Sequence, residues 1–199
     1  MDRKKFLKSA TLTAFGVSIF GKVKANKADQ FVGDCNTTND ILGPFYRPDA
    51  PLTDNLIKKH HKGTPVTIKG VVCQPDCTTP LRNAMIETWQ CNAEGEYDNE
   101  EFHLRGRQFT NMDGEYAFQT ILPGKYLNGR LYRPAHIHFR VTALGYKELI
   151  SQVYFAGDPH ITEDPWASQE KAELRVLNIY PDDVNSNLSV EFNIYLAEA

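Results

Sequence analysis

Apolar and polar residues alternate along several short segments of this chain, most clearly near its C-terminus. There Leu188, Val190, Phe192, Ile194 and Leu196 occupy every second position. Side chains at every second position of a strand share one face, so this pattern predicts a strand with one buried side. Shorter patterns predict further strands at residues 66–71, 84–91, 136–141 and 149–155.

Turn residues separate these segments. Asp113-Gly114 lies between two short strand-like runs and predicts a hairpin over residues 109–118. Pro123-Gly124 marks another turn. Helical signals are sparse, and Asp164-Pro165 is suited to cap and open one short helix that extends to about Leu174. Many short strands, frequent turns and the lack of an internal repeat indicate an antiparallel β-sandwich with little helix.

The N-terminal stretch has a different composition from the rest of the chain. A basic start at residues 3–8 precedes a short apolar run at residues 10–20 and small side chains near Ala25. This order predicts a secretory signal peptide over residues 1–25, with a membrane-leaning N-terminal helix as the alternative. The start resembles a twin-arginine export signal, although Lys4 stands where the second arginine belongs, so the export route stays open. We expect an exported protein, periplasmic or extracellular, without stable membrane insertion after processing.

Net charge argues against one class of partner. The chain carries a net charge of −3, and loss of residues 1–25 would remove six basic residues and one acidic residue, leaving −8. An acidic domain has no general attraction for phosphate backbones, so we expect no nucleic-acid partner.

Four cysteines, Cys35, Cys73, Cys77 and Cys91, lie after the predicted leader. An exported chain meets an oxidising compartment, so disulfides are expected. Cys73 and Cys77 bracket a turn, which favours a bond between them and leaves Cys35 for Cys91, but the other pairings stay open. A structural zinc site is the rival, and one Cys-x3-Cys with two scattered partners is not typical of such sites.

Two histidines lie one residue apart in the segment RPAHIHF at residues 133–139. If this segment is a strand, His136 and His138 share one face, and Ile137 and Phe139 face the core. Two adjacent imidazoles are a start for a metal site, although the same pattern also occurs in strands with two polar residues facing solvent. The other histidines, His60, His61, His103 and His160, are expected to be structural or at the surface.

Two tyrosines change the interpretation of this pair. Tyr97 and Tyr126 follow glycines in loops with the sequences GEY and PGKY, and loops often present functional groups. A highly charged cation such as Fe³⁺ favours anionic oxygen ligands and can deprotonate a phenol despite its ordinary pKa near 10. Each tyrosine taken singly is more typical of a half-buried aromatic residue.

Several motifs in order resemble one family. They are NDILGPFY at residues 39–46, IETWQ at 86–90 leading to GEY at 95–97, DGEYAF at 113–118 leading to PGKY at 123–126, RPAHIHF at 133–139 and QVYFAGDP at 152–159. Together they resemble the intradiol ring-cleavage dioxygenases, which include protocatechuate 3,4-dioxygenase, catechol 1,2-dioxygenase and hydroxyquinol 1,2-dioxygenase. The resemblance implies a transthyretin-like (prealbumin-like) antiparallel β-sandwich with long active-site loops over residues 37–199, after a short segment at residues 26–36.

The same resemblance implies a non-haem Fe³⁺ cofactor and a set of site residues. Tyr97, Tyr126, His136 and His138 match the four metal ligands, and Tyr126 matches the tyrosinate that substrate displaces. Arg133 matches an arginine and Gln152 a glutamine that act beside the ring. The positions that match the substrate pocket, besides Arg133, are Ile41, Pro44, Pro80 and Leu81.

The implied reaction is cleavage of a catechol-type ring with dioxygen to a cis,cis-muconate-type dicarboxylate. Which catechol is used stays open, and a homo-oligomer is compatible with the sequence. A secreted, non-catalytic transthyretin-like binding module is the alternative function, because a fold alone does not confer activity.

Overall fold

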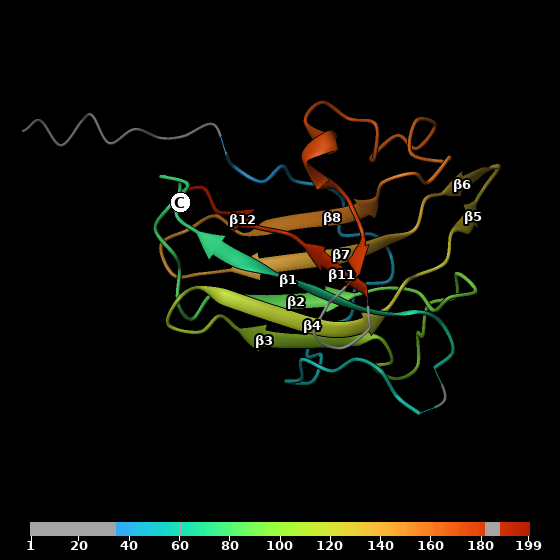
Figure 1. Cartoon of the computed structure of the whole chain (residues 1–199), viewed down its shortest axis with the longest axis horizontal. Coiled ribbons are helices and arrows are strands. Elements are labelled where there is room, and N and C mark those ends of the chain that lie inside the picture. The colour runs from blue at the N-terminus through green and yellow to red at the C-terminus, as the bar shows by residue number, and fades with distance from the viewer. Residues whose placement is uncertain (1–34, 60, 182–187) are drawn as a thin grey trace, which may run out of the picture. The chain divides into compact units, whose positions relative to one another are not determined.

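In the computed structural model, the part of the chain that can be described comprises residues 35–59, 61–181 and 188–199. The predicted signal peptide and His60 lie outside these residues. Two β-sheets and a separate hairpin account for the strands (Figure 1). Among the described residues, no helix is long and apolar enough to span a membrane.

The first sheet is built around the longest strand, β1 (Pro65–Cys73). On one side β1 pairs antiparallel with β4 (Glu115–Ile121). On the other side it pairs parallel with β11 (Leu188–Glu191) and, further along, with β12 (Ile194–Tyr195). Strand β10 (Tyr180–Pro181) completes this sheet beside β11.

The second sheet has the strand order β3-β2-β7-β8-β9. Its strands are β2 (Met85–Trp89), β3 (Arg105–Phe109), β7 (His136–Thr142), β8 (Leu149–Phe155) and β9 (Val176–Leu177). All of its pairs are antiparallel except β8 with β9. The predicted β-sandwich is therefore confirmed, with the addition of parallel pairs made by strands near the C-terminus.

Alternation of side chains produces the core between the two sheets. In β4, Tyr116 and Phe118 are buried and their neighbours Glu115, Ala117 and Gln119 are exposed. In β7, Ile137 and Phe139 join the core cluster. Burial of such apolar side chains contributes roughly 1.5–3 kcal/mol each relative to exposure, so this alternation determines which faces of the sheets meet.

The predicted C-terminal strand is interrupted. Strand β11 ends at Glu191 and β12 begins at Ile194. At the break, Phe192 N–H donates to Lys69 O (2.8 Å) and Val71 N–H donates to the Asn193 side chain (3.0 Å). A Cβ on Gly70 would lie 2.0 Å from Phe192 O. The strand therefore bulges against a glycine of β1 while its alternation of buried residues is kept.

The predicted helix at residues 164–174 is wrong. Asp164 does act as a cap, since its Oδ1 accepts from Trp166 N–H (3.0 Å) and Ala167 N–H (2.8 Å). The turns that follow do not continue into an α-helix, because Lys171 adopts φ 62°, which an L-residue helix cannot contain. Only the short 3₁₀ helix η1 (Ala172–Arg175) forms.

The favoured cysteine pairing is also wrong. A disulfide joins Cys35 to Cys77, whose Cα atoms are 6.0 Å apart, while Cys73 and Cys91 are free and buried. Cys73 is the buried last residue of β1, and its thiol is not bonded to the nearby Cys77. Closeness in sequence does not show whether a cysteine at the end of a strand and a cysteine in the following turn point towards each other.

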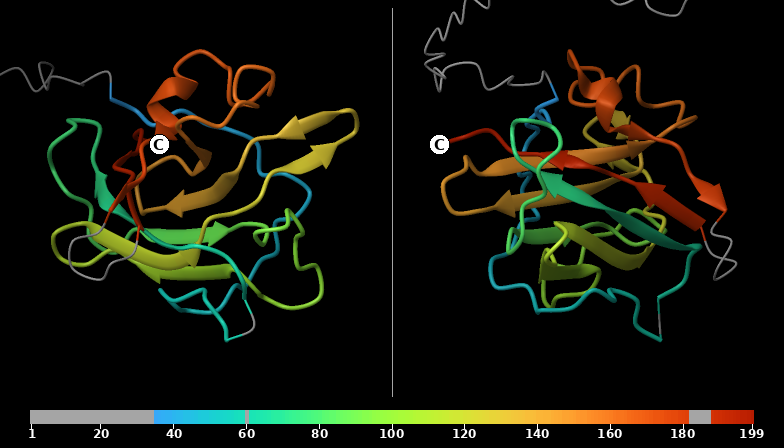
Figure 2. Two further views of the ribbon diagram at one scale, coloured as in Figure 1. Left: turned by 45° about the vertical axis from the view of Figure 1, so that its right-hand side comes forward. Right: turned by 60° about the vertical axis from the view of Figure 1, so that its left-hand side comes forward.

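A two-stranded hairpin of β5 (Tyr126–Asn128) and β6 (Leu131–Arg133) extends from one end of the sheets (Figures 1 and 2). Leu127, Leu131 and Tyr132 of this hairpin are exposed. Its first and last residues are Tyr126 and Arg133, both predicted site residues. The hairpin thus holds two predicted functional side chains at the end of the sandwich.

Candidate metal centre

His136 and His138 lie on the face of β7 opposite the core, as the alternation predicted. Both are nevertheless fully buried, because side chains cover this face as well. The ring of Trp89 stacks on His138 at 4.8 Å between centroids, and the ring of Tyr154 lies 6.0 Å from that of His136. The two imidazoles therefore lie in an interior site and do not face solvent.

Both imidazoles are held neutral. Burial and the charge of Arg133 lower the pKa of His136 to about 3. Burial and the neighbouring His136 lower the pKa of His138 well below its usual range. The His136 Nδ1–H group donates to the Pro134 carbonyl oxygen (2.7 Å), which leaves Nε2 with a free lone pair. A neutral imidazole with one nitrogen bonded to a carbonyl is the form that binds metals.

The Tyr97 phenol oxygen meets both histidines. It lies 3.3 Å from Nε2 of His136 and 3.2 Å from Nε2 of His138. The Phe45 ring stacks on Tyr97 at 4.1 Å between centroids and 8° between planes, which orients the phenol. A phenol has a single proton, so it can donate to only one of these nitrogens and must accept from an N–H group of the other imidazole.

Tyr126 approaches the same point from the β5–β6 hairpin. Its ring centroid lies 5.7 Å from that of Tyr97 and 5.6 Å from that of His136. Burial raises the pKa of both tyrosines, strongly for Tyr97, while the charge of Arg133 lowers it in each case. Neither phenol would ionise near neutral pH without a further positive charge close to its oxygen.

This donor set fits a ferric ion. Two neutral imidazole nitrogens converge with a phenol oxygen, a second phenol lies beside them, and a trivalent cation would supply the charge that both phenols lack. Fe³⁺ favours phenolate oxygen together with imidazole. Among the described residues there is no cluster of three or more His, Cys, Asp or Glu suited to a metal, so tyrosines are what complete this donor set.

Arg133 lies buried beside the four candidate donor side chains. Its Nε donates to Asp164 Oδ2 (2.8 Å), and its Nη2 donates to Gln152 Oε1 (3.1 Å). The Trp166 ring covers the guanidinium at 4.3 Å. Although burial opposes the charge, the hydrogen bond to Asp164 holds the pKa of Arg133 above its ordinary value. A permanent, oriented positive charge is therefore built into the site.

Gln152 and the segment before β1 complete this network. Gln152 Nε2 donates to Asp40 Oδ1 (3.1 Å) and to the Ile41 carbonyl oxygen (3.0 Å). Tyr154 donates to the other oxygen of Asp40 (2.8 Å), and Arg175 also donates to Asp40. Both ends of the Gln152 amide are thus occupied, which fixes its orientation against Arg133.

Of the residues predicted to line a substrate pocket, the structure brings Ile41 and Pro44 to this region. They belong to the loop that crosses His138, where a Cβ on Gly43 would lie 3.2 Å from His138 Cε1. Pro44 is exposed at its surface.

Pro80 and Leu81 do not lie with these residues. They precede the start of β2, where Met85 pairs with Thr142, whereas Trp89 at the other end of β2 pairs with His138. Pro80 packs against the Gly114 turn. The structure therefore removes both from the candidate site, because β2 carries the chain from their end of the sheet to the other.

Several residues of the site received no role from the sequence. Phe45 stacks on Tyr97, Asp40 and Asp164 neutralise buried arginines, and Tyr154 joins Asp40 to Arg133. Asp40 and Phe45 lie in the motif at residues 39–46 and Tyr154 in the motif at residues 152–159, and these motifs are the only sequence feature that points to them. For Asp164 the sequence indicates a helix cap alone.

The remaining described histidines lie outside the donor set. The rings of His61 and His103 are 5.4 Å apart, and His103 Nε2 lies 3.0 Å from a Glu101 carboxylate oxygen. His160 Nε2 lies 3.0 Å from Lys125 Nζ. These contacts are compatible with the structural or surface roles expected for them.

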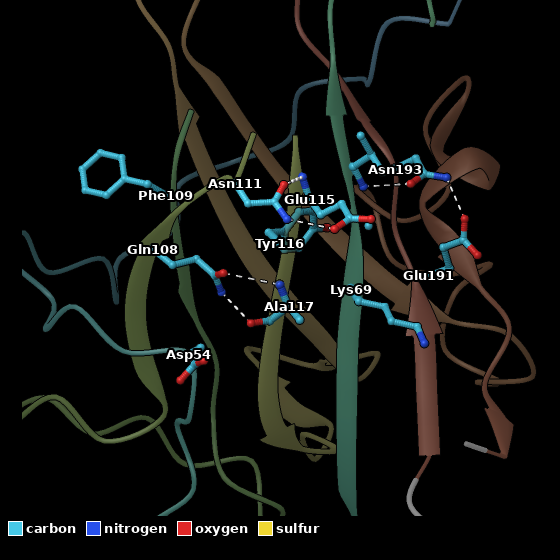
Figure 3. A pocket seen from close by; sticks show the side chains of 12 residues that line it. Asp54, Lys69, Gln108, Phe109, Asn111, Glu115, Tyr116, Ala117, Glu191 and Asn193 are labelled. Atoms are coloured by element: carbon cyan, nitrogen blue, oxygen red, sulfur yellow. Dashed lines mark hydrogen bonds between the residues drawn. The ribbon is translucent and has the colours of Figure 1, made fainter. Parts of the chain in front are cut away.

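A separate groove of about 540 Å³ lies where β3 and β4 meet (Figure 3). There the Gln108 amide bonds to both backbone groups of Ala117, as a neighbouring strand would. None of the predicted site residues lines this groove. The groove and the donor set are therefore different sites.

Comparison with known proteins supplies an independent line of evidence. Residues 41–198 match a family model described as "Dioxygenase". A catechol 1,2-dioxygenase of Candida albicans is 36% identical over 152 residues, which cover 65% of this chain and 50% of that protein. The protocatechuate 3,4-dioxygenase beta chain of Burkholderia cepacia is 33% identical, covering 78% of this chain and 73% of that one.

Solved structures agree with these sequence matches. The dioxygenase domain of a dioxygenase carbohydrate-binding protein fusion from Streptomyces sp. SirexAA-E superposes with a TM-score of 0.72 and 31% identity, covering 82% of this chain and 99% of that domain. The match thus covers nearly the whole of the Streptomyces domain, whereas this chain spans only half the length of the Candida albicans protein.

Proposed function

Since the chain belongs to the family of intradiol ring-cleavage dioxygenases, we propose that it is an enzyme that uses a non-haem ferric ion to cleave a catechol-type ring with dioxygen. The product would be a cis,cis-muconate-type dicarboxylate. The observation that carries the proposal is the convergence of the Tyr97 oxygen with Nε2 of His136 and of His138. Buried next to Arg133, these atoms form a site that a binding module would not require.

In this proposal Tyr97, Tyr126, His136 and His138 hold the ion. When bound, Fe³⁺ supplies Lewis acidity that withdraws electron density from the catecholate and prepares the ring for dioxygen. The neutral state of both imidazoles suits them as ligands without any loss of protons. Tyr97 is the permanent phenolate, because its ring is buried and stacked on Phe45.

Tyr126 is the ligand suited to exchange with substrate. It is only half-buried and begins a short hairpin whose other side chains are largely exposed. A catechol must lose two protons to bind through both oxygens. The Tyr126 oxygen would accept one of them as the side chain turns away, and the other would pass to water, so that binding of substrate and general-base action occur at one atom.

Arg133 acts on the negative charge that develops as the ring opens. Its guanidinium is held by Asp164, so it does not reorganise during the reaction, and such preorganised charge is an effective form of catalysis. The amide oxygen and the NH₂ group of Gln152 are already hydrogen-bonded within the protein, so neither is left for the substrate. We therefore assign it to orienting Arg133, with Ile41 and Pro44 at the edge of the substrate pocket.

The test is an assay of the purified protein against a panel of catechols, with iron content, oxygen uptake and product ultraviolet spectra recorded together. Oxygen uptake with a muconate-type product supports the proposal. His138→Ala is the control and should lose most of the iron and all turnover. Colourless wild-type protein that contains zinc or no metal, and takes up no oxygen with any catechol, would favour the non-catalytic binding module.

Export is a separate proposal that rests on the basic and apolar N-terminal sequence. The Cys35–Cys77 disulfide supports it, because such bonds persist in oxidising compartments. Mass spectrometry of the protein from the expressing cell's periplasm or medium should find an N-terminus near residue 26. Full-length protein confined to the cytosol would contradict export and leave the proposed activity intact.

A further inference from the structure

The two loops that carry Tyr97 and Tyr126 touch through their backbones. Gly124 N–H donates to the Asn92 carbonyl oxygen (2.8 Å), and the Cys91 thiol donates to the Gly124 carbonyl oxygen (3.2 Å). Gly124 is therefore hydrogen-bonded, through its own N–H and its own carbonyl, to the two residues that begin the Tyr97 loop. The pairing is local and lies two residues before Tyr126.

No side chain fits between the loops. A Cβ on Gly124 would lie 2.3 Å from Ala93 O and 2.7 Å from Gly95 N. A Cβ on Gly95 would lie 2.4 Å from Lys125 O and 3.1 Å from Tyr126 Cβ. Since each obstacle includes backbone atoms, neither loop can accept a methyl group without moving as a whole.

The contact is important for Tyr126 in particular. Tyr97 is also held by the Phe45 ring, and Arg105 donates to the carbonyl oxygen of the adjacent Asp98 (2.6 Å). Tyr126 begins β5, which among the described strands pairs only with β6. The hairpin extends away from the sheets (Figure 1). The Gly95–Gly124 contact is thus a direct tie between Tyr126 and the Tyr97 loop.

We propose that the Gly95–Gly124 contact, joined by the Cys91 thiol, is a positioning device that sets the separation of Tyr97 and Tyr126 so that both phenol oxygens address one ferric ion. The proposal rests on the proposed function and extends it to residues that do not touch the metal. A methyl group would have to push the loops apart by about 1 Å, and displacements of that size cost roughly 100-fold in rate. Metal–ligand distances tolerate only about 0.2 Å.

Three glycine variants and two Cys91 variants test the device. Gly124→Ala and Gly95→Ala insert the methyl group. Gly145→Ala is matched to Gly95→Ala, because both glycines have φ +87° but nothing lies within 4 Å of a Cβ on Gly145. Cys91→Ala removes the thiol bond without adding an atom, whereas Cys91→Ser retains a donor at the same position.

Three readouts are taken on each variant: iron per chain, the visible absorption band of the iron-loaded protein, and amide hydrogen exchange of residues 122–128 in the metal-free protein. We expect Gly124→Ala and Gly95→Ala to bind iron with a shifted band and to lose roughly 100-fold in kcat/KM. Gly145→Ala should match the wild type. Cys91→Ala should exchange about threefold to tenfold faster at residues 122–128, the equivalent of one hydrogen bond, and Cys91→Ser should restore protection.

The proposal is overturned if Gly124→Ala keeps the wild-type band and exchange, or if Gly145→Ala changes as much as Gly95→Ala. Should Gly124→Ala fail to fold, Cys91→Ala decides: faster exchange with a shifted band supports the device, and no change refutes it. If the wild type binds no iron, the proposed function fails and the metal-positioning role fails with it. In that case the exchange data still show whether the contact holds the Tyr126 loop.

Discussion

Asp164→Asn tests the electrostatic basis of the site, because Asp164 and Arg133 form a buried ion pair. Their side chains are 1% and 3% exposed, and Arg133 Nε lies 2.8 Å from Asp164 Oδ2. Asparagine retains an oxygen for the Trp166 and Ala167 amides but turns its NH₂ group towards the guanidinium. The substitution therefore removes the counter-charge while keeping the cap and the volume.

Removing one partner of a buried pair costs about 3–5 kcal/mol, because the other charge stays buried. The retained cap places the expected loss of unfolding free energy at the lower end, about 3 kcal/mol, which for a domain of this size lowers the melting temperature by roughly 6–12 °C. The measurement is denaturant unfolding of the metal-free protein with its disulfide intact. Turnover should fall as well, because Arg133 loses its orientation.

The control is Asp158→Asn. Asp158 also accepts backbone N–H bonds, from Ala135 (2.9 Å) and His160 (2.9 Å), but no described arginine pairs with it. We expect a loss of about 1 kcal/mol or less. A loss below about 1 kcal/mol for Asp164→Asn, or equal losses for both variants, would refute the conclusion that a buried ion pair holds Arg133.

Three other outcomes are expected. Tyr126→Phe should keep its iron but change its visible band and bind catechol more slowly, and an unchanged spectrum would remove Tyr126 from the metal. Acid should destabilise the metal-free protein, because the pKa of His136 is lowered to about 3 in the folded state and is about 6.5 in the unfolded chain. The stability that neutral His136 contributes is present above the unfolded pKa and falls with decreasing pH, by about 2 kcal/mol at pH 5. Denaturant midpoints at pH 7 and pH 5 measure this, and His136→Asn should reduce the difference while the part due to His138, whose pKa is also lowered, stays. Thiol titration of the unfolded, unreduced protein should find the two free cysteines, Cys73 and Cys91, and four titratable thiols would contradict the Cys35–Cys77 bond. Cys35→Ser should lower the free energy of unfolding by about 4 kcal/mol, because the bond closes a loop of 42 residues.

Predictions that rest on local chemistry agree with the structure. The alternation in residues 136–141 placed Ile137 and Phe139 in the core and both histidines on the other face. The Asp113-Gly114 turn forms between β3 and β4, but the hairpin predicted over residues 109–118 is wrong, because β3 pairs with β2 and β4 pairs with β1 in the other sheet. These features depend on the period of a strand and on backbone preferences of single residues, both of which are visible in one sequence.

Predictions that needed distances through space were less successful. Cys73 and Cys77 are close in sequence, yet Cys77 bonds to Cys35 because only those two side chains meet. The resemblance assigns Pro80 and Leu81 to the substrate pocket, yet β2 separates them from His138. The cap predicted at Asp164 is present, but the same carboxylate also forms an ion pair with Arg133, which lies 31 positions away in the sequence.

The chain's own pattern is sufficient to specify a sandwich, a same-face histidine pair and the loops that carry two tyrosines, since each follows from side-chain period and turn chemistry over a few residues. It does not specify that the Tyr97 oxygen lies within 3.3 Å of both imidazoles, that Asp40 and Asp164 neutralise the arginines, or that Gly95 and Gly124 touch. Those relations join residues far apart in sequence. They arise only when the two sheets pack and bring the chain's loops to one end, because burial and backbone contact are properties of the folded whole.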